Sequence, residues 1–188
     1  MLRLRFPGGR QLEISPGFFG MLCLFWELSG TGEHGALALL LAIFLHEGGH
    51  LLAFLAAGIP VQRLTLSWSG AAIRPRPGIY PFSAQLLTLL AGSAASFLWA
   101  GVTALLPLPD EYMWMQLFCG VFSLLPLPGL DGGEIAALLA GRWFPGNERG
   151  LTYFFRAVKL LLAALLMVAC VQGGSFLPMV WCVCLLLA

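Results

Sequence analysis

The sequence places two histidines and a glutamate in the middle of an apolar stretch. Residues 46–50 read His-Glu-Gly-Gly-His inside the run GALALLLAIFLHEGGHLLAFLAAG. Residues four apart project from one face of a helix, so the imidazoles of His46 and His50 can reach a single zinc ion. Glu47 lies about 100° around the same helix, which suits a group that acts on a metal-bound water. This spacing is the signature of zinc hydrolases.

The predicted chemistry is hydrolysis. Zinc lowers the pKa of a bound water towards about 7, and a carboxylate beside that water can take its proton and deliver it to a leaving amine. We therefore predict that His46 and His50 bind zinc and that Glu47 is the catalytic acid/base. The alternative is a pair of hydrogen-bonded polar residues in the core. Ionisable side chains inside a membrane span are usually functional, which favours the metal.

Two glycines follow the glutamate. Each costs a helix roughly 1 kcal/mol relative to alanine, but a residue without a side chain lets another backbone come close. We expect Gly48 and Gly49 to make room beside the metal, either for a neighbouring helix or for substrate.

The composition is that of an integral membrane protein. Of the 188 residues, 59% are hydrophobic and 10% are charged, whereas about 25% are charged in a typical soluble domain. The mean hydropathy is +0.87. The net charge of +1 gives no indication of a nucleic-acid partner, and the five cysteines lie within apolar runs, unlike a secreted disulfide framework.

Apolar segments predict the fold class, an all-α polytopic membrane protein. Its six expected spans are 17–30, 35–58, 84–107, 112–130, 151–172 and 175–188. If both termini are cytosolic, all ten Lys and Arg side chains fall on the cytosolic side, as the positive-inside rule requires. We expect residues 1–188 to form one integral membrane domain in the lipid bilayer of a bacterial cell membrane.

Two segments alternate apolar and polar residues as strands do. They are LRLRFPGGRQLEI at the N-terminus and VQRLTLSWSGAAIRP after the second span, and each predicts a small β-hairpin. The second can be a plain surface hairpin, or an exposed edge with which an extended peptide pairs. In the latter case Leu66 and Trp68 are candidate substrate-positioning residues.

A catalytic zinc usually has a third protein ligand. The carboxylate candidates are Asp110, Glu111, Asp131 and Glu134. At 1.5 Å per residue, the histidines lie about 17–23 Å along the second span, in its cytosolic half. Asp110 and Glu111 belong to the opposite end. Asp131 follows the break SLLPLPGLDGG at the right depth, because proline cannot continue a helix. Glu134 is the weaker alternative, since it starts the next amphipathic helix.

These motifs resemble the site-2 protease family of intramembrane zinc metalloproteases, and most closely its sporulation factor IV FB type. That family pairs H-E-x-x-H in one span with Leu-Asp-Gly in a later one, and here the second motif is Leu130-Asp131-Gly132. A hairpin after the zinc helix matches residues 61–74, so the resemblance covers nearly the whole chain. It implies that His46, His50 and Asp131 bind one Zn²⁺ and that Glu47 is the catalytic acid/base.

The resemblance also implies partners. Substrates of the family are membrane-associated proteins cut within or near the bilayer, among them a pro-sigma factor in the sporulation branch, and inhibitory or activating membrane partners are expected. Some members carry a PDZ insert or a C-terminal nucleotide-sensing domain, and we expect neither here.

Three positions depart from the family pattern. Ser123 stands where the longer motif N-x-x-P-x-P-x-L-D-G begins with asparagine, and Ser96 ends Ala-Gly-Ser-Ala-Ala-Ser where the family has A-G-P-x-x-N. Gly48 replaces a large apolar residue. Serine keeps a donor and an acceptor but is shorter than asparagine, so Ser123 and Ser96 are candidate substrate-positioning residues.

Two other functions compete with a zinc metalloendopeptidase. A catalytically silent membrane scaffold needs a broken ligand set, and this set is complete. Metal transporters often show internal repeats and a chain of polar sites across the bilayer, whereas the polar residues here cluster at one depth.

Overall fold

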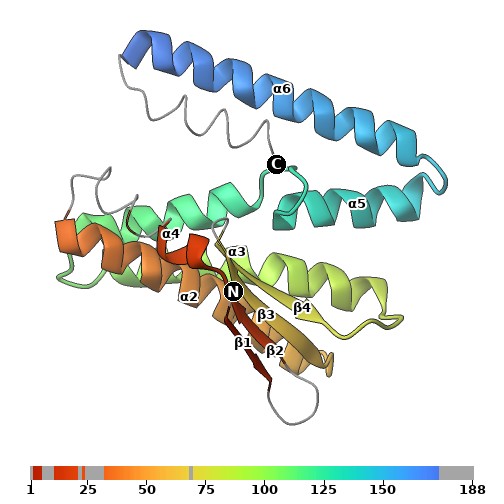
Figure 1. Cartoon of the computed structure of the whole chain (residues 1–188), viewed down its shortest axis with the longest axis horizontal. Coiled ribbons are helices and arrows are strands. Elements are labelled where there is room, and N and C mark those ends of the chain that lie inside the picture. The colour runs from red at the N-terminus through yellow and green to blue at the C-terminus, as the bar shows by residue number, and fades with distance from the viewer. Residues whose placement is uncertain (1, 6–10, 21–22, 24–31, 68–69, 174–188) are drawn as a thin grey trace. The chain divides into compact units, whose positions relative to one another are not determined.

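The computed structural model describes residues 2–5, 11–20, 23, 32–67 and 70–173. Within these ranges the chain forms two compact units, Met1–Leu124 and Leu125–Ala188, each described by itself (Figure 1). The expected span 17–30 lies mostly outside the described residues, and the expected span 175–188 lies wholly outside them.

Two helices of the first unit are long and apolar enough to cross a membrane. They are α2, Gly32–Ala56, and α3, Phe82–Ala104, at the places where the sequence predicts spans 35–58 and 84–107. Only 33% of the most apolar window of each is buried within the protein, and α2 exposes large side chains such as Phe44 and Leu52. The core helix of a soluble protein would bury such residues, so an apolar solvent explains the outward faces better.

The fourth expected span, 112–130, is corrected by the structure. Helix α4 runs Asp110–Ser123 and is seven residues shorter at its end than expected. Pro126 and Pro128 lack the N–H that continued helix requires, and Gly129 adopts a left-handed φ of 86°, which suits glycine. The second unit contains α5, Asp131–Trp143, and α6, Glu148–Gly173; α6 covers the expected span 151–172.

The strands form one sheet in the order β1-β2-β3-β4. Their bounds are Leu2–Arg5, Gln11–Ile14, Val61–Ser67 and Gly70–Pro75. Strands occur at both places where the sequence predicts them, and β1/β2 and β3/β4 pair antiparallel. The parallel pairing of β2 with β3 was not predicted from the sequence, and it joins residues that are 52 positions apart.

A buried carboxylate supports that parallel pairing. Glu13 on β2 is 4% exposed, and its oxygens lie 3.2 Å from Arg3 Nε on β1 and 3.5 Å from Arg63 Nη1 on β3. A buried charge is tolerated when it is paired. The ion pairs therefore connect β1, β2 and β3. One further backbone hydrogen bond follows the β2/β3 ladder, in which Ser15 N–H donates to the Leu66 carbonyl at 2.8 Å.

One polar side chain in the helical core has no partner among the described residues. The amide of Gln116 on α4 is 1% exposed, and neither its oxygen nor its nitrogen makes a hydrogen bond. An unsatisfied buried group costs about 1–3 kcal/mol, whereas an apolar group of similar shape does not. We expect Gln116→Leu to raise the free energy of unfolding by about 1 kcal/mol, measured as a higher thermal unfolding midpoint in detergent.

Gln85 on α3 offers a matched control. Its Nε2 donates to the Tyr80 carbonyl at 2.8 Å, so Gln85→Leu removes a hydrogen bond that exists and should lower the midpoint. A lower midpoint for Gln116→Leu as well would show that its amide has a hydrogen-bond partner, such as a buried water.

Candidate metal centre

The two histidines of α2 face the buried side of α3. His50 is opposite Thr88, and His46 is opposite Ser96 two turns further along α3, so the two helices run antiparallel at this point. His46 and His50 are 5% and 7% exposed. Two imidazoles this deeply buried need specific partners for their ring nitrogens.

Hydrogen bonds to α3 fix both rings. His50 Nδ1 donates to the Thr88 carbonyl at 2.7 Å, which places the proton on Nδ1 and leaves a lone pair on Nε2. His46 Nδ1 lies 3.1 Å from Ser96 Oγ, and this hydroxyl can accept a proton from the ring. Metal-ligating histidines almost always use their other ring nitrogen in this way, because the bond sets the tautomer and the ring orientation.

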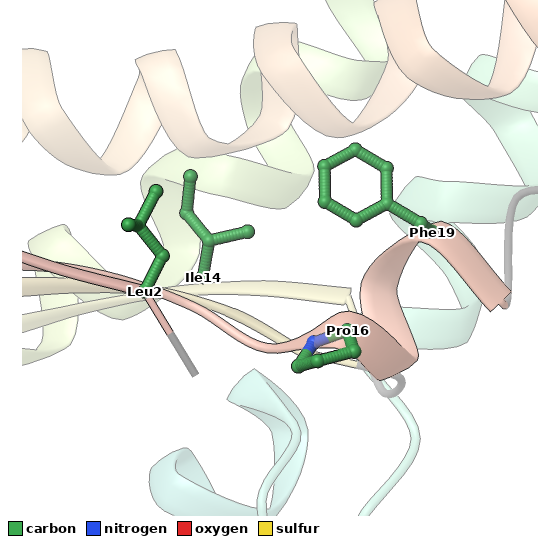
Figure 2. A pocket seen from close by; sticks show the side chains of 4 residues that line it. All are labelled: Leu2, Ile14, Pro16 and Phe19. Carbon is green, nitrogen blue, oxygen red and sulfur yellow. The ribbon is translucent and has the colours of Figure 1, made fainter.

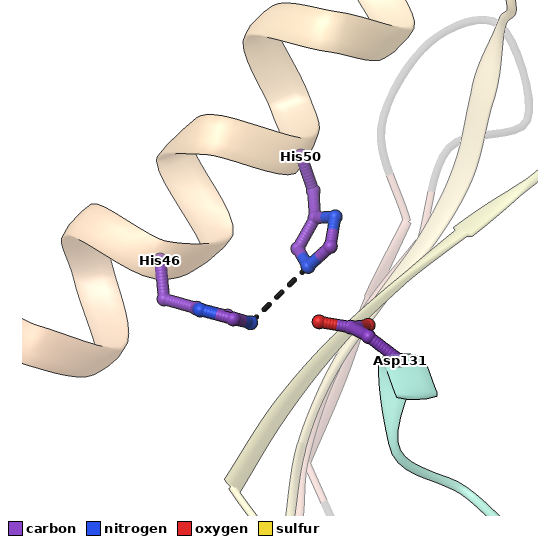
Figure 3. A group of neighbouring side chains, drawn as sticks. All are labelled: His46, His50 and Asp131. Atoms are coloured by element: carbon purple, nitrogen blue, oxygen red, sulfur yellow. Dashed lines mark hydrogen bonds between the residues drawn. The ribbon is translucent and has the colours of Figure 1, made fainter. Parts of the chain in front are cut away.

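The Nε2 atoms of the two rings point toward each other (Figure 3). His46 Nε2 and His50 Nε2 are 3.2 Å apart, and the rings meet edge to face at an interplanar angle of 78°. Two nitrogens bound tetrahedrally to zinc, each at about 2.05 Å, are separated by about 3.3 Å. The nitrogen pair therefore fits a zinc ion without rearrangement.

Gly92 on α3 leaves the space in which the rings meet. A Cβ built at Gly92 would overlap His50 Nε2 and lie 2.7 Å from His46 Nε2. Gly49 lets the backbones of α2 and α3 come close together, because a Cβ built at Gly49 would lie 2.5 Å from the Ala91 carbonyl oxygen. The prediction that a glycine of the motif admits a neighbouring helix is confirmed for Gly49. Gly48 has no such neighbour within 4 Å among the described residues.

The remaining predicted residues of the first unit lie as follows. Glu47 is half-buried on α2, and its Oε2 atom is buried. Ser96 is fully buried and bonded to His46. Ser123, at the end of α4, donates to the Gly120 carbonyl at 3.1 Å and lies 2.8 Å from Ser93 Oγ. Leu66 is half-buried in β3, and Trp68 lies outside the described residues.

The candidate carboxylates separate by position. Asp110 and Glu111 lie in the first turn of α4. The part of α4 that is near the histidine pair is Gly120, which packs on Ser96, the hydrogen-bond partner of His46. Ten residues of helix, about 15 Å, separate Asp110 from Gly120, so the two N-terminal carboxylates are too far away to be ligands. Asp131 and Glu134 lie in the first turn of α5 in the second unit. Asp131 is half-buried and Glu134 is exposed.

Two contributors to this centre, Thr88 and Gly92, were not predicted from the sequence. Thr88 supplies a backbone carbonyl, which no side-chain motif can reveal. A signal was nevertheless present, because the otherwise apolar helix α3 repeats small or hydroxylated residues along one face. These residues, all buried, are Thr88, Gly92, Ser96, Ala100 and Thr103.

No family model matches the chain. The structure is similar to that of the site-2 protease from Methanocaldococcus jannaschii, with a TM-score of 0.69 over 98% of this chain and 91% of that chain, at 19% sequence identity. The chain therefore has the fold of a site-2 protease.

Two relatives are similar in sequence. The candidate zinc metalloprotease sll0528 of Synechocystis is 30% identical over 146 residues, which are 69% of this chain and 38% of the relative. The candidate zinc metalloprotease Rip3 of Mycobacterium tuberculosis is 30% identical over 168 residues, 80% of this chain and 42% of the relative. The chain thus spans about two fifths of the length of these relatives.

Proposed function

We propose that the chain is an intramembrane zinc metalloendopeptidase of the site-2 protease type, which hydrolyses peptide bonds of membrane-associated proteins. The observation that carries the proposal is the histidine pair, with Nε2 atoms 3.2 Å apart and both Nδ1 atoms held by α3. The fold shared with a site-2 protease and the two relatives named as candidate zinc metalloproteases agree with it.

His46, His50 and Asp131 are the proposed ligands of one zinc ion per chain. Two imidazoles and a carboxylate each offer one ligand atom of a kind that zinc takes, and a catalytic zinc keeps a fourth position open. Asp131 begins α5 directly after the proline-rich turn, so its backbone is not constrained by the helix before it. Bound zinc would supply an acidified water and would polarise the peptide carbonyl.

Glu47 is the proposed acid/base. It follows His46 directly on α2, so its side chain leaves the helix about 100° away from that of His46. Its carboxylate takes a proton from the attacking water as the hydroxyl adds to the peptide carbonyl carbon. The same proton then passes to the peptide nitrogen as the C–N bond breaks, which leaves a free amine and a free carboxylic acid. A half-buried glutamate can make both transfers without moving the helix.

The setting of this chemistry is the bilayer. The outward apolar faces of α2 and α3 support a membrane location, and the proposal includes six spans with both termini in the cytosol of a bacterium. The family resemblance extends the proposal to the sporulation factor IV FB subtype, with a pro-sigma factor as one substrate and membrane proteins as regulators.

The ligand set can be tested by metal content. We expect the purified protein to hold about one zinc per chain and His46→Ala or Asp131→Ala to lose most of it, because each removes one of three ligands. Glu134→Ala is the matched control, since it removes a carboxylate from the same turn of α5 but should keep the zinc. The measurement is elemental analysis of protein that remains folded by circular dichroism.

Two results would contradict this assignment. Full zinc occupancy in Asp131→Ala together with loss in Glu134→Ala would move the third ligand to Glu134. Zinc that crosses the membrane in reconstituted vesicles, with no cleavage of any membrane-tethered substrate, would favour a transporter instead.

A further inference from the structure

The register of the sheet gives it two chemically different faces. Side chains of paired residues point to the same side, and successive residues of a strand alternate between sides. One face is apolar and carries Leu2, Leu4, Leu12, Ile14, Leu64, Leu66 and Ile73. The other face is polar and carries Arg3, Arg5, Gln11, Glu13, Arg63, Thr65, Ala72 and Arg74.

The polar face has more positive charge than it can neutralise. Its one carboxylate, Glu13, is paired with Arg3 and Arg63. Arg5 and Arg74 are exposed, and no carboxylate among the described residues pairs with either. Arg63 and Arg74 are also direct partners across β3 and β4, and like charges in that position are destabilising. A bound anion would relieve this repulsion.

The sheet lies close to the ends of two candidate spans. Residues 57–60 join α2 to β3, and residues 76–81 join β4 to α3. At no more than about 3.6 Å per residue, the shorter link reaches roughly 18 Å. The link also folds back on α2, since Ile59 N–H donates to the Phe54 carbonyl at 2.9 Å. Strand β3 therefore begins beside the end of α2, where a span would meet the lipid headgroups.

The apolar face is open at its β1 end (Figure 2). Leu2, Ile14, Pro16 and Phe19 line a cavity of about 410 Å³. Leu2 and Phe19 are 56% and 59% exposed, and Leu4 on the same face of β1 is 43% exposed. An acidic protein partner on the polar face would leave these apolar groups in water, whereas a lipid leaflet offers acyl chains and phosphates together.

We propose that this sheet is an interfacial anchor that binds anionic phospholipids. Arg5, Arg63 and Arg74 hold the phosphate groups, and the apolar end of β1 with Phe19 takes acyl chain. The arrangement follows the logic of interfacial amphipathic helices, in which apolar burial and attraction to anionic lipid add together. This site is distinct from the metal centre and does not depend on protease activity.

The test is a lipid titration of the full chain in detergent. Phosphatidylglycerol should raise the thermal unfolding midpoint more than phosphatidylcholine does, and inorganic phosphate alone should have no such effect. The double variant Arg5→Gln/Arg74→Gln should bind phosphatidylglycerol about 25-fold more weakly, at about fivefold for each arginine near an anionic surface. It leaves the Glu13 ion pairs intact.

A matched control keeps both charges. Arg5→Lys/Arg74→Lys should retain most of the wild-type affinity for phosphatidylglycerol, because a lysine near an anionic surface contributes about as much as an arginine. The proposal also predicts that Phe19→Ser weakens binding of the long-chain lipid. Equal affinities for the two lipids, or an unchanged affinity in Arg5→Gln/Arg74→Gln, would overturn it. Stabilisation by polyglutamate but not by phosphatidylglycerol would replace the lipid with an acidic protein segment.

Discussion

Glu47→Gln is expected to abolish cleavage of a membrane-tethered substrate while the zinc content stays at the wild-type level. Glutamine has nearly the shape of glutamate but cannot take a proton from water. General acid–base catalysis contributes about 10²–10⁴-fold to the rate. The measurement is cleavage of a co-expressed or co-reconstituted candidate substrate, together with elemental analysis of the same preparations. An unchanged zinc content would show that Glu47→Gln removes the proton carrier and leaves the metal centre intact.

Glu111→Gln is the control for this experiment. It makes the same chemical change in the first turn of α4, at the end of that helix away from the histidine pair, and should leave cleavage unchanged. Cleavage by Glu47→Gln at a near wild-type rate would show that another group carries the proton. A silent scaffold would cut no substrate in either form.

Gly92→Ala is expected to destroy the metal centre although neither the ligands nor the base are changed. The new methyl group would overlap His50 Nε2 and crowd His46 Nε2, so the His50 ring would have to turn away from the Thr88 carbonyl. Loss of an outer-shell partner alone costs 10–100-fold in metal affinity. With a ligand displaced as well, we expect at least about 100-fold weaker zinc binding, measured by competition with a chelator.

Gly101→Ala is the matched variant on the same helix. A Cβ built at Gly101 meets no atom within 4 Å, so the zinc affinity should not change. The helix should gain stability by up to about 1 kcal/mol. Equal zinc affinity in Gly92→Ala and wild type would mean that the histidine rings do not occupy the positions seen beside Gly92.

The sequence alone determined the parts of the centre that depend on local geometry. A spacing of four on a helix puts His46 and His50 on one face whatever surrounds them, because the helical period is fixed by the backbone. The extent of α2 and α3 followed from apolar composition. The break after α4 followed from Pro126 and Pro128, since each lacks a donor, although the sequence did not show that the helix ends as early as Ser123.

The tertiary structure decided what depends on contacts between distant segments. The Thr88 carbonyl, the Ser96 hydroxyl and the space at Gly92 set the tautomer and the orientation of the histidine rings, and all three come from a helix about 40–50 residues further along the chain. The parallel pairing of β2 with β3 likewise brings Glu13 to Arg63 from a distant part of the chain. A motif fixes which atoms could bind a metal, but only the packing of α2 against α3 removes enough of their freedom to bring two ring nitrogens within 3.2 Å.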